Sequence, residues 1–148
     1  MNKVKEESSL QDRNHANLIA LLKRAQSKSG CVTEESIAEL AQSLHIPISE
    51  VYGVATFYSF LSNKPLGRNI IRICKSLPCY LKNSQMIIKS VEDKIGIKPG
   101  ETTPDGKFSF ELTNCIGACD KAPAMLINND VHVNLTPDKI SEVLESYK

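Results

Sequence analysis

Four of the five cysteines in this 148-residue chain fall into two widely separated pairs. Cys74 and Cys79 enclose four residues, and Cys115 and Cys119 enclose three. Because we expect no export signal, the odd number of cysteines argues against a framework of disulfide bonds and favours metal or redox chemistry. A fold that uses all four thiols in one centre must bring two distant loops together.

The composition is ordinary for a globular protein, with 41% hydrophobic and 24% charged residues. The length allows one domain or two small ones. A net charge of +1 gives no electrostatic argument for a nucleic-acid or membrane partner. No apolar stretch approaches the roughly 18 residues of a membrane-spanning helix. The N-terminus mixes Lys and Glu without an apolar core, so we expect a cytoplasmic protein with neither signal nor transit peptide.

The N-terminal part of the chain is predicted to be helical. Residues 1–13 are polar, and we expect them to be flexible. Over residues 14–64, apolar residues recur at helical spacing and predict a three-helix bundle. The first helix would end before Gly30, Thr33 would cap the second, and Ser49 with Glu50 would open the third.

Residues 63–67 resemble a hinge to a second domain at 68–148. Alternating apolar residues predict half-buried strands around Ile71 and over 108–112. Asn83 with Ser84 is expected to cap a helix that Gly96 ends, Thr136 is expected to cap a last helix, and a hairpin turn is expected at 128–130. The order β-α-β-β-β-α favours one sheet with helices against it. The fold class is therefore α+β or α/β, with a helical bundle before the sheet domain.

The cysteines lie where the predicted strands end. Cys74 ends the first strand, and Cys115 directly follows the second. If these strands are neighbours that finish at the same edge of the sheet, four thiols gather at one exposed rim. Gly117 would let the backbone of the second loop approach closely without a Cβ clash, and Pro78 would fix the approach to Cys79.

Residue chemistry alone leaves several kinds of centre open. Thioredoxin-type redox chemistry needs a C-x-x-C motif, which is absent. The spacing permits a structural zinc site, although zinc knuckles usually sit on glycine-rich hairpins. A [2Fe–2S] cluster takes two thiolates on each iron, and two pairs on two loops fit its wider footprint. Four packed cysteines without any ligand are the remaining alternative.

The flanking residues carry a resemblance to a known family. Residues 74–84, residues 114–119 and the pair Ala122 and Pro123 resemble the small [2Fe–2S] subunit of NADH dehydrogenases. This is the 24-kDa-subunit family of respiratory complex I, with the matching subunits of NAD-linked formate dehydrogenases and electron-bifurcating [FeFe]-hydrogenases. The resemblance runs over residues 18–147 and includes residues 50–58 and 96–103.

The resemblance implies a thioredoxin-like ferredoxin domain that carries one [2Fe–2S] cluster. The family's four ligands fall on Cys74, Cys79, Cys115 and Cys119, and no catalytic residue is implied. A larger partner subunit would bind FMN and NAD(H), and a further catalytic subunit would complete the enzyme. Many soluble members have Ala-Cys-His at the second ligand, whereas this chain has Pro78, Cys79 and Tyr80, as in the complex I branch. We favour a soluble bifurcating hydrogenase or related NAD(P)H-linked complex, with complex I as the alternative.

Residues 37–51 offer a different hypothesis, because they resemble a helix-turn-helix of a DNA-binding protein. Charge argues against it. Residues 31–61 contain four Glu and no Asp, Lys or Arg, which gives a charge of −4 that phosphates would repel. We therefore expect no nucleic-acid partner.

Several other residues have structural interpretations. Cys31 stands alone at a helix start, and we expect it to be structural. His15, His45 and His132 are scattered and are expected to be surface or packing residues. Four aromatic residues are expected in the bundle core or on a face that docks on another subunit: Tyr52, Phe57, Tyr58 and Phe60.

Overall fold

The computed structural model describes residues 17–147. The chain divides into two compact units between Pro65 and Leu66. We call described residues 17–65 the helical unit and residues 66–147 the sheet unit. The flexible segment predicted at 1–13 and His15 lie outside the described residues. Within residues 17–147, none of the helices combines the length and hydropathy needed to cross a bilayer.

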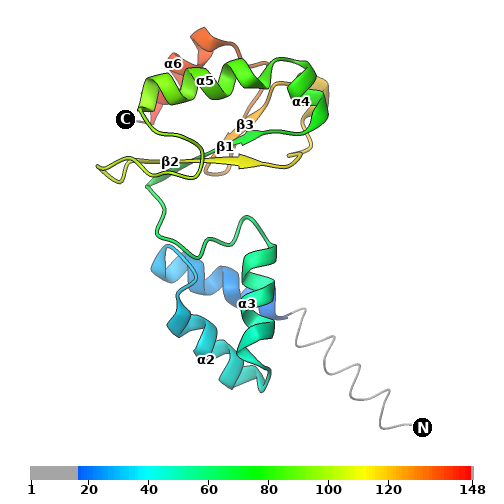
Figure 1. Cartoon of the computed structure of the whole chain (residues 1–148), viewed down its shortest axis with the longest axis vertical. Helices are drawn as coiled ribbons and strands as arrows, with labels where there is room; N and C mark the ends of the chain where they lie inside the picture. Colours follow the sequence, from blue (N-terminus) through cyan, green and yellow to red (C-terminus); the bar gives the residue numbers. More distant parts are fainter. Residues whose placement is uncertain (1–16, 148) are drawn as a thin grey trace, which may run out of the picture. The chain divides into compact units, whose positions relative to one another are not determined.

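The helical unit contains helical residues 17–29, helix α2 (Glu34–Leu44) and helix α3 (Ile48–Phe57) (Figure 1). Gly30 has a φ of +79°, which ends the first helix as predicted. Thr33 caps α2 by accepting a hydrogen bond from the Ser36 N–H at 3.2 Å, also as predicted. The three helices bury a common apolar core: Leu18, Leu22, Val32, Ile37, Ala41, Val51, Ala55 and Leu61.

Helix α3 differs from the prediction at both ends. It begins after Pro47, which makes no side-chain cap, rather than at a Ser49–Glu50 opening. Proline suits this position because its fixed φ matches a helix start and it has no N–H to leave unpaired. Tyr58, expected in the bundle core or on a docking face, lies after the last turn and is exposed.

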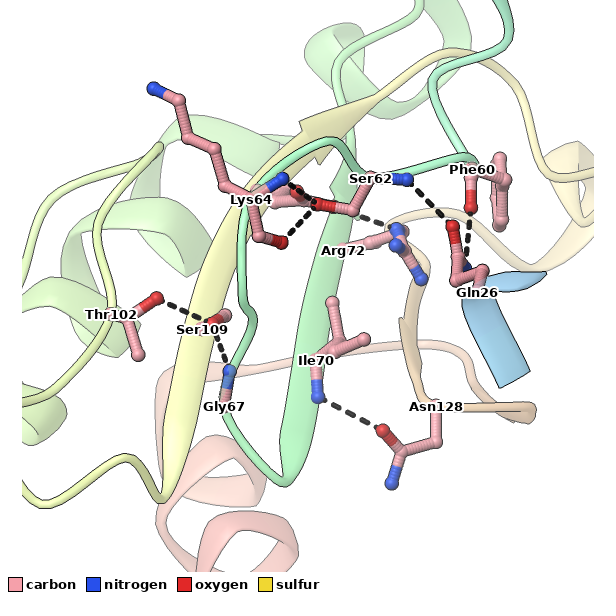
Figure 2. Close-up of polar contacts among 11 residues, drawn as sticks. Gln26, Phe60, Ser62, Lys64, Gly67, Ile70, Arg72, Thr102, Ser109 and Asn128 are labelled. Atoms are coloured by element: carbon pink, nitrogen blue, oxygen red, sulfur yellow. Dashed lines mark hydrogen bonds and ion pairs between the residues drawn. The ribbon is translucent and has the colours of Figure 1, made fainter. Parts of the chain in front are cut away.

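The C-terminal part of the helical unit is fastened to its first helix by Gln26 (Figure 2). The Gln26 side-chain amide donates to the Phe60 carbonyl at 3.1 Å and accepts from the Ser62 N–H at 2.7 Å. These two bonds hold the segment after α3 against a helix more than thirty residues earlier in the chain.

The sheet unit has four strands in the order β2-β1-β3-β4. Strand β1 (Asn69–Cys74) pairs in parallel with β2 (Phe108–Thr113) and antiparallel with β3 (Met125–Ile127). Strand β4 (Asp130–His132) forms the predicted hairpin with β3, and Asn128 in its turn has a φ of +55°. The predicted element order is confirmed for these strands.

Strand β1 was expected to be half buried, and this prediction is wrong. Every residue of β1 except Ile70 is buried, and β1 is an inner strand of the sheet. Arg72 is 5% exposed, and its Nε lies 2.8 Å from Glu111 Oε2 on β2. The ion pair compensates a charge that would otherwise be costly to bury.

Helices α5 (Ser84–Ile95) and α6 (Pro137–Ser146) lie on the same face of the sheet (Figure 1). Thr136 caps α6 and Gly96, with a φ of +74°, ends α5, as predicted. Asn83 precedes α5 but makes no side-chain cap. The helices and the sheet share a core: Ile71, Ile73, Ile87, Ile88, Val91, Ile97, Phe108, Phe110, Met125, Ile127, Leu135, Ile140 and Leu144.

Gly67, expected in the hinge, is bound to the sheet unit (Figure 2). Its N–H donates to Ser109 Oγ at 2.7 Å, and Ser109 Oγ also bonds Thr102 Oγ1 at 2.7 Å. A Cβ at Gly67 would lie 2.8 Å from the Phe108 carbonyl carbon. Ser109 is therefore buried, although the expected alternation places it on the exposed face of β2. The last apolar residue of the strand, Leu112, is 37% exposed, which also departs from that alternation. Mobility of the segment before Gly67 remains a prediction.

Candidate metal centre

The carboxyl ends of β1 and β2 lie side by side, which is the arrangement the cysteine positions required. In the parallel register Cys74 is opposite Thr113, the last residue of each strand. Cys115 follows two residues later, so both cysteine-bearing loops leave the same edge of the sheet. The predicted strand neighbourhood is therefore confirmed.

The first pair is held by strand β1 and by a short helix, α4 (Leu77–Leu81). Cys74 ends the strand at 1% exposure, and Cys79 lies in α4 at 2% exposure. Pro78 stands in the first turn of α4, where a missing N–H costs nothing. Helix α4 was not predicted, because five residues are too few to show a helical period. Proline followed by two apolar residues after Ser76 was the available signal.

The second pair lies on the loop after β2. The Sγ atoms of Cys115 and Cys119 are 3.2 Å apart, and both residues are exposed. Gly117 has a φ of +84°, and its N–H donates to Cys115 Sγ at 3.4 Å. Nothing lies within 4 Å of a Cβ built on Gly117, so the backbone conformation, rather than the expected close approach, explains the glycine.

The two pairs therefore differ in exposure, which corrects the expectation of one exposed rim. Cys74 and Cys79 form a buried apolar cluster with Ala124. Side chains from the second loop complete its wall, together with two later residues: Ile116, Ala118, Ala122 and Val133. Because Ile116 and Ala118 lie between the exposed cysteines in sequence, the two loops are in contact. Ala124 and Val133 had no signal in the sequence as part of the site.

The surroundings shift the thiol pKa values in opposite directions. Burial, with the neighbouring Cys74 thiol, raises the pKa of Cys79 to about 11, and the Ala124 backbone partly offsets this rise. The Gly117 N–H, followed by the bond with Cys119, lowers the pKa of Cys115. The hydrogen bond with Cys115 is the main cause that raises the pKa of Cys119. Charges on Cys119 and on both buried thiols would influence one another across the two loops.

The donor set fits a [2Fe–2S] cluster. All four cysteines are free thiols, and they form two pairs, with the Cys74 and Cys79 thiols interacting in one and Cys115 and Cys119 in the other. Two thiolates on each of two irons is the ligand set of such a cluster. Within the described residues, no group of three or more His, Cys, Asp or Glu side chains is gathered tightly enough to hold a single metal ion.

The remaining candidates lie elsewhere or at the periphery. Cys31 is buried in the helical unit, next to Val32 of that unit's core. His45 is exposed at the end of α2, and His132 is half-buried on β4. The charged residues near the ligands in sequence are exposed: Lys75, Lys82, Asp120 and Lys121.

Comparison with known proteins supports the same interpretation. The model of the thioredoxin-like [2Fe–2S] ferredoxin family matches residues 3–148. A subunit of the NADH-quinone oxidoreductase of Escherichia coli (strain K12) is 47% identical over 130 residues, which cover 88% of this chain and 78% of that protein. The corresponding protein of Pseudomonas aeruginosa is 41% identical over 129 residues, covering 87% and 78%.

A solved structure extends the likeness to a hydrogenase. The crystal structure of an NAD⁺-reducing [NiFe]-hydrogenase in the air-oxidised state superposes with a TM-score of 0.76 and 27% sequence identity. The match covers 88% of this chain but only 22% of the hydrogenase chain, so this chain spans about a fifth of that protein. The family match implies one [2Fe–2S] cluster in this chain. The chain belongs to the thioredoxin-like [2Fe–2S] ferredoxin family, in the group that resembles the small iron–sulfur subunit of NADH dehydrogenases.

Proposed function

We propose that this chain is the electron-transfer subunit of an NAD(P)H-linked oxidoreductase complex, and that Cys74, Cys79, Cys115 and Cys119 ligate its [2Fe–2S] cluster. The observation that carries the proposal is the parallel pairing of β1 and β2, which brings both cysteine pairs to one edge of the sheet. When bound, such a cluster accepts and releases one electron at a time. The chain's own residues hold the irons, exclude water from one side and leave the other side open.

The experiment is metal analysis of anaerobically purified protein. We expect two irons and two labile sulfides per chain, with the visible absorbance of a [2Fe–2S] protein. Cys74→Ala or Cys115→Ala removes a ligand and should abolish the colour, whereas Cys31→Ala in the helical unit should keep it. One zinc per chain and no colour would overturn the proposal in favour of a structural zinc site.

We propose that the electron donor is a larger subunit that binds FMN and NAD(H). The surface beside the buried cysteine pair suits a protein partner, because it presents exposed apolar side chains: Leu77, Tyr80, Leu81 and Met86. Residues 75–91 contain three Lys and no Asp or Glu, so the complementary surface of the partner is acidic at its rim. A second exposed apolar set lies on and after α3: Ile48, Tyr52, Phe57, Tyr58 and Phe60.

NADH reduction tests this partner. NADH should bleach the cluster only after the flavoprotein subunit is added, since nothing in the sequence matches a dinucleotide-binding motif. Leu77→Glu should weaken that reduction while the cluster's spectrum stays unchanged. Val131→Glu is the matched control, because Val131 is also exposed but lies on β4. Direct reduction by NADH without the flavoprotein would overturn the assignment of a separate donor.

The kind of complex is a further part of the proposal. The curated relatives at 41–47% identity are named as subunits of NADH-quinone oxidoreductase, which favours a complex of the NADH:quinone oxidoreductase type. The hydrogenase match is more distant at 27% identity, and a bifurcating hydrogenase stays a prediction. Purification of the native complex decides: a quinone-reducing assembly supports the first, and hydrogen-dependent reduction of the cluster supports the second.

A further inference from the structure

The two cysteine pairs of the proposed cluster site lie in different surroundings. Cys74 and Cys79 are 1% and 2% exposed and lie against the apolar Ala124. Cys115 and Cys119 are exposed to water. A cluster held by all four would therefore have one iron on the apolar side and the other on the solvent side.

Backbone hydrogen bonding does not cancel this difference. The Gly117 N–H donates to Cys115 Sγ at 3.4 Å, on the side that water also reaches. On the buried side Cys79 is 2% exposed and packs with Cys74 and Ala124, and an apolar environment disfavours additional negative charge. Asp120 is the one acidic neighbour in sequence of the exposed pair, and its charge opposes further negative charge at Cys119.

Reduction adds one negative charge to a centre already surrounded by thiolates. That charge is more stable where water and N–H donors reach the sulfurs than in an apolar pocket, and exposure and hydrogen bonds are known determinants of cluster potential. We propose that the iron held by Cys115 and Cys119 is the one that takes the electron supplied by the partner. One electron from the partner converts that Fe³⁺ to Fe²⁺, the iron on Cys74 and Cys79 stays Fe³⁺, and no covalent bond forms or breaks.

This inference rests on the ligand set of the proposed function, and a serine series tests it. Serine can still ligate iron through oxygen, and a harder ligand disfavours the ferrous state of the iron that it binds. Cys115→Ser and Cys119→Ser should lower the midpoint potential and change the EPR spectrum of the reduced protein. Cys74→Ser and Cys79→Ser should leave both much closer to wild type. The opposite pattern, or equal shifts from all four variants, overturns the inference.

A second pair leaves every ligand in place, in case a serine variant fails to hold a cluster. Asp120→Asn and Lys75→Gln each remove one exposed charge next to a ligand, on the exposed and on the buried side respectively. We expect Asp120→Asn to raise the midpoint potential by more than Lys75→Gln lowers it. An equal or larger effect of Lys75→Gln overturns the inference while the proposed function stands. A wild-type protein without two irons overturns both.

Discussion

The helical unit and the sheet unit each have an apolar core, but they differ in the cysteines that they contain. The sheet unit holds all four paired thiols. The helical unit holds only Cys31, which is buried. Its residues 31–61 carry four Glu and no Lys, Arg or Asp, together with exposed aromatic residues on and after α3. In the proposed function, the sheet unit therefore carries the cluster, and the exposed aromatic residues of the helical unit are available to a partner.

The cores of the two units can be broken separately, and this gives the largest expected effect. Phe110 is fully buried on β2, in the core shared with α5 and α6. Phe110→Ala should cost about 3–5 kcal/mol, because it removes a large side chain and leaves a cavity. Loss of the cluster's visible absorbance during chemical denaturation reports the unfolding of the sheet unit, and it should occur at a lower denaturant concentration than in wild type.

Leu22→Ala is the counterpart in the helical unit. Leu22 is fully buried among the three helices, and its truncation should cost about 2–5 kcal/mol. Far-UV circular dichroism should then show earlier loss of helix, while the visible absorbance keeps its wild-type midpoint. If each substitution moves both signals equally, the two units unfold as one and the comparison fails.

Two glycines sharpen the comparison with effects of opposite sign. A Cβ at Gly67 would lie within about 3 Å of backbone atoms of Phe108 and Gly106. Gly67→Ala should therefore destabilise the sheet unit by about 1–3 kcal/mol, as in other overpacked sites. Gly53 lies in α3 with nothing within 4 Å of its added Cβ, so Gly53→Ala should stabilise the helical unit by about 0.5–1 kcal/mol.

The same two signals, absorbance for the sheet unit and circular dichroism for the helical unit, measure these glycine variants. A neutral Gly67→Ala would show that residues 66–68 move away from β2 at little cost. That result would support the sequence prediction that Gly67 belongs to a hinge at residues 63–67.

The fold was largely predictable where local chemistry determines it. Thr33 and Thr136 cap their helices and Gly96 ends α5 as the sequence predicts, because caps depend on one or two residues. The pairing of β1 and β2 was likewise anticipated as a condition, because Cys74 ends the first predicted strand, Cys115 follows the second, and a shared centre requires these strand ends to be neighbours.

Features that depend on distant residues were not predictable. The buried Arg72 depends on the opposite charge of Glu111 on the neighbouring strand, and no local sequence pattern predicts that ion pair. Ser109 is buried where its hydroxyl accepts from the Gly67 N–H, more than forty residues earlier in the chain. The unequal burial of the two cysteine pairs depends on Ala124 and Val133, which reach the site only through the hairpin of β3 and β4. The spacing of the cysteines therefore points to the four proposed ligands but does not predict their environment.

Helix caps offer a smaller, matched comparison between the units. Thr33 accepts from the Ser36 N–H at 3.2 Å in the helical unit, and Thr136 accepts from the Lys139 N–H at 3.4 Å in the sheet unit. Thr33→Ala and Thr136→Ala should each cost about 1 kcal/mol. Each loss should appear only in the signal of its own unit. Serine at either position keeps the hydroxyl and should restore most of the lost stability.

The smallest expected effect is a pH dependence confined to the sheet unit. Burial lowers the pKa of His132 on β4, and the nearby Asp130 only partly opposes this. The unfolded chain therefore binds more protons than the folded chain just below the ordinary histidine pKa of about 6.5, so stability is full above that pH and declines as pH falls through it. His132→Asn should flatten this slope in the absorbance midpoints between pH 7 and about pH 5, whereas Val131→Thr, an exposed neighbour on the same strand, should keep it. A wild-type slope that persists in His132→Asn would assign the pH dependence to other groups, and a slope in the circular dichroism signal alone would place it in the helical unit.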